Sequence, residues 1–337
     1  MNIKFLARLM VLLSAFTLIL TGCSSNSDQA GTSEKKNERV FLNVTTGSNT
    51  ASVYAFSSSI SKLIAEHNPE INLTVQASGG GKENLSRLIE KKADIGVVYG
   101  PEIETAINGL NEYEGKADQY KQIKGIFAWP YAAVQLIVRE DSGINSIEDL
   151  IGKKIAIGAP GSTGATYVWP YVLPEFGMTK KNSDWQYLNQ TAAAEALGDG
   201  AIDAITALSS ARVGAIETLS LTRKIKMIAV PEPQRKNVIK NGIGLLEAEQ
   251  DPKLYGKNQI NDSAIPTIGL SGTFVVREDV PEEVVYNITK TLFENLDDFH
   301  KSHSSAKDIT LEKALDDMAV PLHPGAEKYF KEKGLIK

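Results

Sequence analysis

The sequence predicts an α/β fold of two lobes with a ligand cleft between them. Segments with the alternating pattern of strands take turns with segments of helical periodicity, which is typical of a mostly parallel sheet. One long apolar run at 126–141 interrupts this series, which then starts again. "LIVRED" at 136–141 recurs as "FVVRED" at 274–279, and we interpret both as strands where the chain passes between the lobes. The expected lobes are 40–133 with 270–337, and 134–269.

The first series of elements shows the expected periodicities clearly. Residues 52–68 place Val53, Phe56, Ile60, Leu63 and Ile64 on one face of a helix, whereas 71–77 alternates strictly, as a strand does. Pro101 suits the first turn of a further helix. The expected strands are 40–44, 71–77 and 94–100, and the expected helices are 52–68, 82–93 and 101–110.

The second series repeats the rhythm. A glycine ends the helix expected at 191–200, and Trp169-Pro170 predicts a kinked, packed helix. The expected strands are 154–160, 185–189, 201–210 and 224–230, and the expected helices are 146–153, 161–173, 191–200 and 211–220.

The N-terminus predicts export. A basic start, a short apolar core and small residues before a cut site are typical of a secretory signal at 1–22. "LTGC" at 20–23 resembles the lipobox of bacterial lipoproteins, so we expect Cys23 to carry a lipid that anchors the chain to a membrane; the alternative is an uncleaved anchor. Residues 23–39 lack larger apolar side chains and predict a flexible tether.

Composition excludes several classes of partner. Removal of the signal takes away Lys4 and Arg8, so the formal charge moves from -5 to about -7. This acidic balance, without a basic stripe, argues against nucleic acid. No stretch after the signal reaches the roughly 18 apolar residues of a membrane span. We expect no cofactor.

Three strand-to-helix loops are candidate binding segments, because ligands of α/β sheets bind at the carboxyl ends of strands. They are rich in Gly, Ser and Thr, whose hydroxyls join the N–H groups of helix starts in suiting an anion such as a carboxylate. The alternative is that these residues only cap helices and turn the chain. The segments are "TTGSNTAS" (45–52), "ASGGGKEN" (77–84) and "GAPGSTGAT" (158–166), with Gly47, Ser48, Asn49, Thr50, Gly80, Pro160, Gly161, Ser162 and Thr163 as expected contacts.

Arg212 is the charged candidate. It is expected at a helix start, where a basic residue opposes the helix dipole, and a guanidinium can hold a carboxylate through two hydrogen bonds. The alternatives are an ion pair with Glu217 or Glu195, or solvent exposure. Aromatic side chains would add apolar contact with a hydroxyl. The further expected contacts are Ser209, Tyr54, Tyr99 and Tyr131.

Enzyme chemistry has little support in the sequence. His300 and His303 share a helical face, but only Asp297 and Asp298 lie near as further metal ligands, and a solvated helix end is the favoured interpretation. "SISK" at 59–62 matches S-x-x-K without the S-D-N and K-T-G that this chemistry requires. No nucleophile, base and orienting group form a recognisable set. We therefore expect a protein that is not an enzyme.

The chain after residue 40 resembles the TAXI-type substrate-binding proteins of tripartite ATP-independent periplasmic (TRAP) transporters. The resemblance rests on "TTGSNTASVY", "ASGGGKENLSRL", "SIEDLIGKKIAIGAPGS", "ALGDGAIDAI" and above all "MAVPLHPGAEKYFKEKG". It implies the type II periplasmic-binding-protein fold and a monomeric receptor that closes on a small solute outside the cytoplasmic membrane. The implied partner is an ion-gradient-driven TRAP permease.

The chain departs from the family pattern in the expected ligand loops. Ser48 and Val53 stand where the family has Gly and Tyr, and "SSAR" at 209–212 replaces a segment with Gly and Pro. Glutamate, glutamine and related dicarboxylates are the solutes that the resemblance implies, and the sequence leaves the choice among them open. A ligand-binding lipoprotein sensor that docks on a signalling membrane protein is the alternative function.

Overall fold

The computed structural model describes residues 39–49, 51–209, 211–241, 244–303, 306–307 and 309–337. The chain divides after residue 37, and the second unit, residues 38–337, is compact and is described below. The expected signal, the lipidated Cys23 and nearly all of the expected tether lie outside the described residues.

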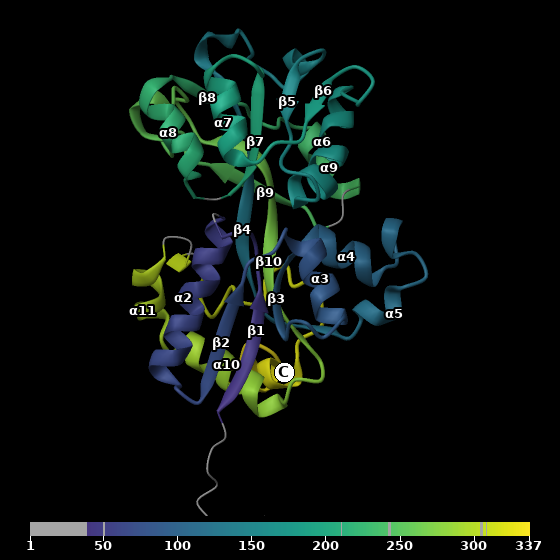
Figure 1. The fold of residues 1–337 in the computed structure, drawn as a ribbon, viewed down its shortest axis with the longest axis vertical. Helices are drawn as coiled ribbons and strands as arrows, with labels where there is room; N and C mark the ends of the chain where they lie inside the picture. The colour runs from purple at the N-terminus through teal and green to yellow at the C-terminus, as the bar shows by residue number, and fades with distance from the viewer. Residues whose placement is uncertain (1–38, 50, 210, 242–243, 304–305, 308) are drawn as a thin grey trace, which may run out of the picture. The chain divides into compact units, whose positions relative to one another are not determined.

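The second unit consists of two α/β lobes, which lie at the bottom and the top of Figure 1. The lower lobe contains a parallel set of three strands, in which β1 pairs with both β2 and β3. Its elements are β1 (Val40–Thr45), β2 (Ile71–Gln76), β3 (Ile95–Tyr99), α2 (Ser52–His67), α3 (Gly81–Ile89), α4 (Gly100–Ile107), α5 (Ala117–Tyr120), α10 (Glu282–Glu294), α11 (Leu296–Ser302) and α12 (Pro324–Glu332).

The upper lobe repeats this plan. Here β5 pairs in parallel with both β6 and β7, and helices connect the strands. Its elements are β5 (Lys154–Ala156), β6 (Asp184–Gln186), β7 (Ala204–Leu208), β8 (Ile225–Met227), α6 (Trp169–Val172), α7 (Gln190–Gly198), α8 (Gly214–Thr222) and α9 (Gln234–Asn241).

Two long antiparallel strands, β4 (Ile123–Arg139) and β10 (Ile265–Arg277), run through both lobes (Figure 1). They complete a strand order of β2-β1-β3-β10-β4-β7-β5-β6, with β9 (Leu246–Gln250) beside the first part of β10. The partner of β4 changes from β10 to β7 between Ala133 and Val134. The expected lobe boundaries, which were placed near this change, stay a prediction.

The recurring "VRED" segments end these two strands and make the same contacts. Arg139 Nε lies 3.0 Å from an oxygen of Asp141, and Arg277 Nε lies 2.8 Å from an oxygen of Asp279. A second nitrogen of each guanidinium donates to a backbone carbonyl, which lies in the upper lobe for Arg139 and in the lower lobe for Arg277. The similarity of the two segments is therefore one of structure as well as of sequence.

The lower core is aromatic. Phe56 of α2 stacks on Trp129 of β4 with ring centroids 4.8 Å apart, and Phe127 stacks on Phe274 across the two long strands. The helix face expected for 52–68 is confirmed, since all five apolar residues are buried. They are Val53, Phe56, Ile60, Leu63 and Ile64.

Two helices expected in the upper lobe are wrong in type. Residues 146–153 form only a single 3₁₀ turn at Glu148–Leu150, since Gly152 leaves the helical region at φ +78°. The helix expected at 161–173 begins as a π-helix, Gly164–Val168, and passes through α6 into a 3₁₀ turn. Pro170 and Pro174 lack the N–H that regular helix bonding requires, which explains the irregular path.

Candidate interlobe binding site

The parallel strands of the lower lobe deliver three loops to one edge. The loop after β1 contains Gly47, where an added Cβ would lie 2.7 Å from Val53, so the loop can pack only with glycine there. Helices α2 and α3 begin behind residues Ala51 and Gly80, neither of which contributes a capping side-chain bond. The first amides of both helices thus point toward this edge.

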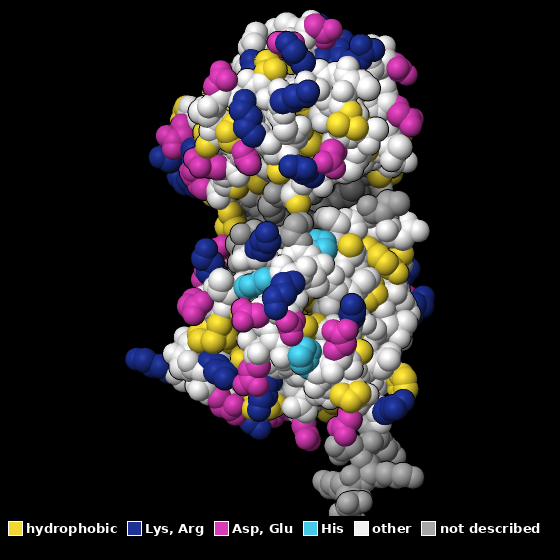
Figure 2. Space-filling view, turned by 90° about the vertical axis from the view of Figure 1, so that its left-hand side faces the viewer, with side chains coloured by type: hydrophobic (Ala, Val, Ile, Leu, Met, Phe, Trp, Pro, Cys, Tyr) yellow, Lys and Arg dark blue, Asp and Glu magenta, His cyan; other side chains and the backbone are white. Residues whose placement is uncertain are grey.

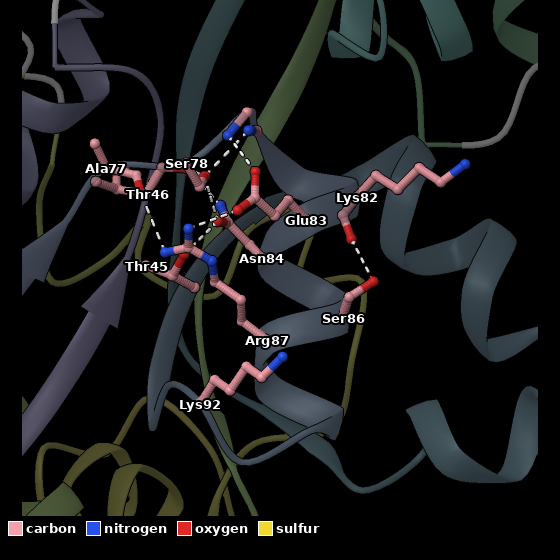
Figure 3. A network of polar contacts seen from close by, with 12 residues as sticks. Thr45, Thr46, Ala77, Ser78, Lys82, Glu83, Asn84, Ser86, Arg87 and Lys92 are labelled. Carbon is pink, nitrogen blue, oxygen red and sulfur yellow. Dashed lines mark hydrogen bonds and ion pairs between the residues drawn. The ribbon is translucent and has the colours of Figure 1, made fainter.

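Asn84 joins three strands of the lower lobe, and Figure 3 shows its contacts at the ends of β1 and β2. Its side-chain oxygen accepts from the hydroxyls of Thr45 and Ser78, each at 2.6 Å. Its side-chain nitrogen donates to the carbonyls of Thr46 at 2.5 Å and Val97 at 2.7 Å. The side chain is buried with all four hydrogen bonds made, so it fixes the loops relative to one another. Asn84 lies in the expected "ASGGGKEN" loop but is not among the expected ligand contacts.

The loop at 77–80 uses its own donors. The N–H of Gly79 donates to Glu83 at 2.7 Å, and that of Gly80 donates to the Ser78 hydroxyl at 3.1 Å. The bond from Gly79, together with the adjacent Arg87 guanidinium, lowers the pKa of Glu83 in spite of burial. Figure 3 shows this carboxylate at the loop. An anionic ligand would have to compete with Glu83 here, which makes the loop after β1 the better anion site.

The upper lobe presents the loop after β5 to the same region. Gly158 and Gly161 hold left-handed conformations, with φ of +111° and +78°. Ser162 is half-buried and turns back, since its hydroxyl accepts from the N–H of Ala165 at 3.4 Å. Thr163 is buried and precedes the π-helix, whereas Pro160 is exposed.

Several polar contacts join the two lobes. The Thr163 hydroxyl donates to the carboxylate of Glu102, which is the third residue of α4. Tyr167 of the π-helix donates to Glu112 at 3.1 Å, and Glu112 also pairs with Lys82 at 3.1 Å. The loop after β5 therefore faces the start of helix α4, as the predicted cleft requires. In Figure 2, the surface of the molecule is indented between the two lobes on one side.

Glu102 is the functional candidate that the sequence analysis missed. Its side chain is completely buried, and its carboxylate also accepts from the N–H of Tyr99 at 3.2 Å. Burial raises its pKa to about 7, against opposing hydrogen bonds from Thr163 and Tyr99. In the sequence it follows a proline at a helix start, where an acidic residue is ordinary, and no local pattern reveals the burial.

Ser209 and Arg212 belong to a different part of the junction. The carbonyl of Ser209 accepts from Gln135 at 2.8 Å and from Gln250 at 2.7 Å, and both donors lie on strands of the crossing. Arg212 pairs with Glu217 at 3.0 Å and donates to the carbonyl of Leu254 at 2.7 Å. The structure thus shows the ion pair that the sequence left open as an alternative to ligand binding.

The remaining predicted residues divide into three groups. Tyr54 is half-buried in the first turn of α2, and Tyr99 is buried at the end of β3. Ser48 and Asn49 are exposed in the loop after β1. Thr50 lies outside the described residues, and Tyr131 is described only as backbone within β4.

Metal chemistry finds no support in the described part of the chain, where no group of three potential ligands of the His, Cys, Asp and Glu type occurs. His300 contacts the carbonyl of Ile309 at 2.8 Å, and His303 packs edge-on against Phe56. His323 accepts from the N–H of Gly325 and so caps α12. These three histidines serve local structure.

Two open surface grooves lie away from the interlobe contacts. One, of about 480 Å³, runs along α3 beside the end of β2, and one, of about 550 Å³, lies between α7 and α8. Across the face in Figure 2, acidic and basic side chains are interspersed. Among the described helices, none is both long and apolar enough to cross a membrane.

Comparisons with known proteins agree with this architecture. Residues 44–334 match the model of the NMT1-like family. The chain is similar to PhnD1 from Prochlorococcus marinus in complex with methylphosphonate, with 12% identity over 89% of this chain and 100% of that chain and a TM-score of 0.52. It is also similar to the periplasmic aliphatic sulphonate binding protein SsuA from Escherichia coli, with 15% identity over 86% and 78% of the two chains and a TM-score of 0.45. The TctC solute binding protein from Polaromonas follows, with 17% identity over 80% and 86% and a TM-score of 0.44. The predicted periplasmic-binding-protein fold is confirmed.

Proposed function

The chain belongs to the NMT1-like family, and from this premise we propose that it is an extracytoplasmic receptor that binds a small carboxylate and delivers it to a membrane transporter. The observation that carries the proposal is the meeting of both lobes' strand-to-helix loops at Thr163 and Glu102. Such loops form the usual ligand site of two-lobe α/β proteins.

The finer assignment rests on the resemblance of the sequence to TAXI-type proteins. The permease would then be of the TRAP type and driven by an ion gradient. A lipid on Cys23 would keep the receptor close to it. Since no described side chains form a set of nucleophile, base and orienting group, binding without chemistry is the function that the residues support.

The carboxylate would bind at the loop after β1. The amides at the start of α2 and the hydroxyls of this loop are suitable donors, and the helix dipole favours an anion there. Gly161, Ser162 and Thr163 would approach the solute from the upper lobe. Arg212 would have to leave Glu217 to take part, so we assign the anion to uncharged donors.

A thermal-shift screen tests this function. Residues 38–337, which form one compact unit, would be unfolded and refolded to remove bound solute, and then screened against amino acids, dicarboxylates and 2-oxoacids. A solute at a hundred times its Kd adds about 2.7 kcal/mol, a shift of about 4 °C for a chain of this size. We expect such a shift with at least one carboxylate. A well-folded protein that responds to none of them would contradict the proposal.

A further inference from the structure

Glu102 is a buried acid for which the described part of the fold provides no cation. Its carboxylate lies against the start of α3 so closely that a Cβ on Gly81 would fall 1.5 Å from it. It accepts one hydrogen bond from the lower lobe, at Tyr99, and one from the upper lobe, at Thr163. The acid is therefore placed between the lobes, where a bound solute would lie.

The charges around Glu102 provide no cation for it. Among the described residues, no Lys, Arg or His forms an ion pair with Glu102, and Lys82, which follows Gly81, is paired with Glu112. Two titratable side chains that interact electrostatically with Glu102 are Tyr113 and Tyr167. Their hydroxyls lie 3.3 Å from each other. A wholly buried carboxylate without a cation is costly, and its pKa is raised for that reason.

We propose that Glu102 is the receptor group for a positively charged amino group of the solute. This inference rests on the proposed function and narrows it: the solute is an amino acid or another carboxylate with an amine, and a plain dicarboxylate is disfavoured. The amine would supply the missing cation at Glu102, while the solute carboxylate would bind at the start of α2.

A purely structural role for Glu102 makes a different prediction. Glutamine has the same shape and can accept the hydrogen bond from Tyr99, so Glu102→Gln keeps the helix start while it removes the charge. Glu104→Gln is the matched control, because Glu104 is a half-buried acid on the same helix that makes none of the contacts between the lobes given above. Loss of amine recognition in the first variant alone would identify the charge at Glu102 as the cause.

The experiment is isothermal titration of refolded residues 38–337 with two pairs of probes that differ only in the amino group. The pairs are L-glutamate with glutarate, and L-glutamine with glutaramate. We expect the wild-type protein to bind at least one amine-bearing probe about 30-fold or more tightly than its partner, as for a buried charge pair. Glu102→Gln should remove most of this preference, and Glu104→Gln should keep it within about twofold.

Proton release gives a second readout. Near pH 6 the carboxyl of Glu102 is mostly protonated, and an ammonium group favours its ionised form, so binding should release about one proton. Titrations in buffers of different ionisation enthalpy measure this release, which Glu102→Gln should abolish.

The possible failures are distinct. Equal affinity of the wild-type protein for the two members of each pair would overturn the role of Glu102 and leave the receptor function standing. This comparison needs no variant, so it holds even if Glu102→Gln folds poorly. Failure of all carboxylates, in this experiment and in the screen, would overturn both proposals.

Discussion

Glu102 makes the stability of the ligand-free protein depend on pH. Its pKa is raised from 4.5 to about 7, so the folded state holds the proton more tightly than the unfolded state. The contribution of Glu102 to the free energy of unfolding is fully present below pH 4.5 and is lost as the pH rises through 7. The pKa of Glu112 is lowered and the pKa of Tyr113 is raised to about 12, so neither of these neighbours titrates between pH 4.5 and pH 7.

The prediction is that wild-type protein loses up to about 3 kcal/mol of unfolding free energy, relative to Glu102→Gln, between pH 5 and pH 8. Urea unfolding of both proteins at the two pH values measures the difference. A constant difference across this range would show that the carboxyl is not desolvated as the structure has it.

The roles of single residues were the least predictable from the sequence. The Gly- and Ser-rich loops were found from their composition, yet Asn84 and Glu102 look like ordinary helix residues. Much of their importance comes from contacts with distant residues, since Asn84 bonds to Val97, 13 positions away, and Glu102 bonds to Thr163, 61 positions away. Local sequence patterns do not reveal contacts between residues that lie so far apart in the chain.

At the scale of elements, Asn84 gives a clear test of how three strands are held together. Asn84→Ala would leave two buried hydroxyls and two buried carbonyls without this partner, and we expect a loss of about 2–4 kcal/mol in unfolding free energy. Urea unfolding measures it. Ser86→Ala, two residues further along α3, removes only an exposed bond to the Lys82 carbonyl and should change the value by less than about 0.5 kcal/mol. Comparable losses in the two variants would contradict the assigned role.

The elements themselves were largely predictable. Helix 52–68 and strand 71–77 have strong periodicity, and both appear within a few residues of the expected bounds. The failures at 146–153 and 161–173 occur where Gly and Pro allow a helix to start but not to continue regularly. Recurrence of "VRED" pointed correctly to two similar strands, β4 and β10.

For the whole molecule, we expect the solute to bring the lobes together. Small-angle scattering of solute-free protein should show a larger radius of gyration than the saturated complex, because a ligand favours the state in which both lobes contact it.

Tyr167→Phe removes the interlobe bond to Glu112 and should weaken binding by about 3- to 10-fold.

Tyr171→Phe is the control, since Tyr171 lies on the following helix and is exposed. Unchanged dimensions on saturation would contradict closure. Equal losses of affinity in the two tyrosine variants would contradict the role of the Tyr167 contact.

The strand order also governs how the molecule can be assembled. Strand β10 lies between β3 and β4, although 125 residues of chain separate it from β4, the nearer of the two along the sequence. A chain that emerges from its N-terminus therefore has every strand of β4 to β8 before β10 exists, whereas the lower sheet stays split between β3 and β4. Strands β4, β5, β6 and β7 of the upper lobe can pair while the lower lobe waits for its central strand, so half of the proposed binding site is formed before the other half has a stable support.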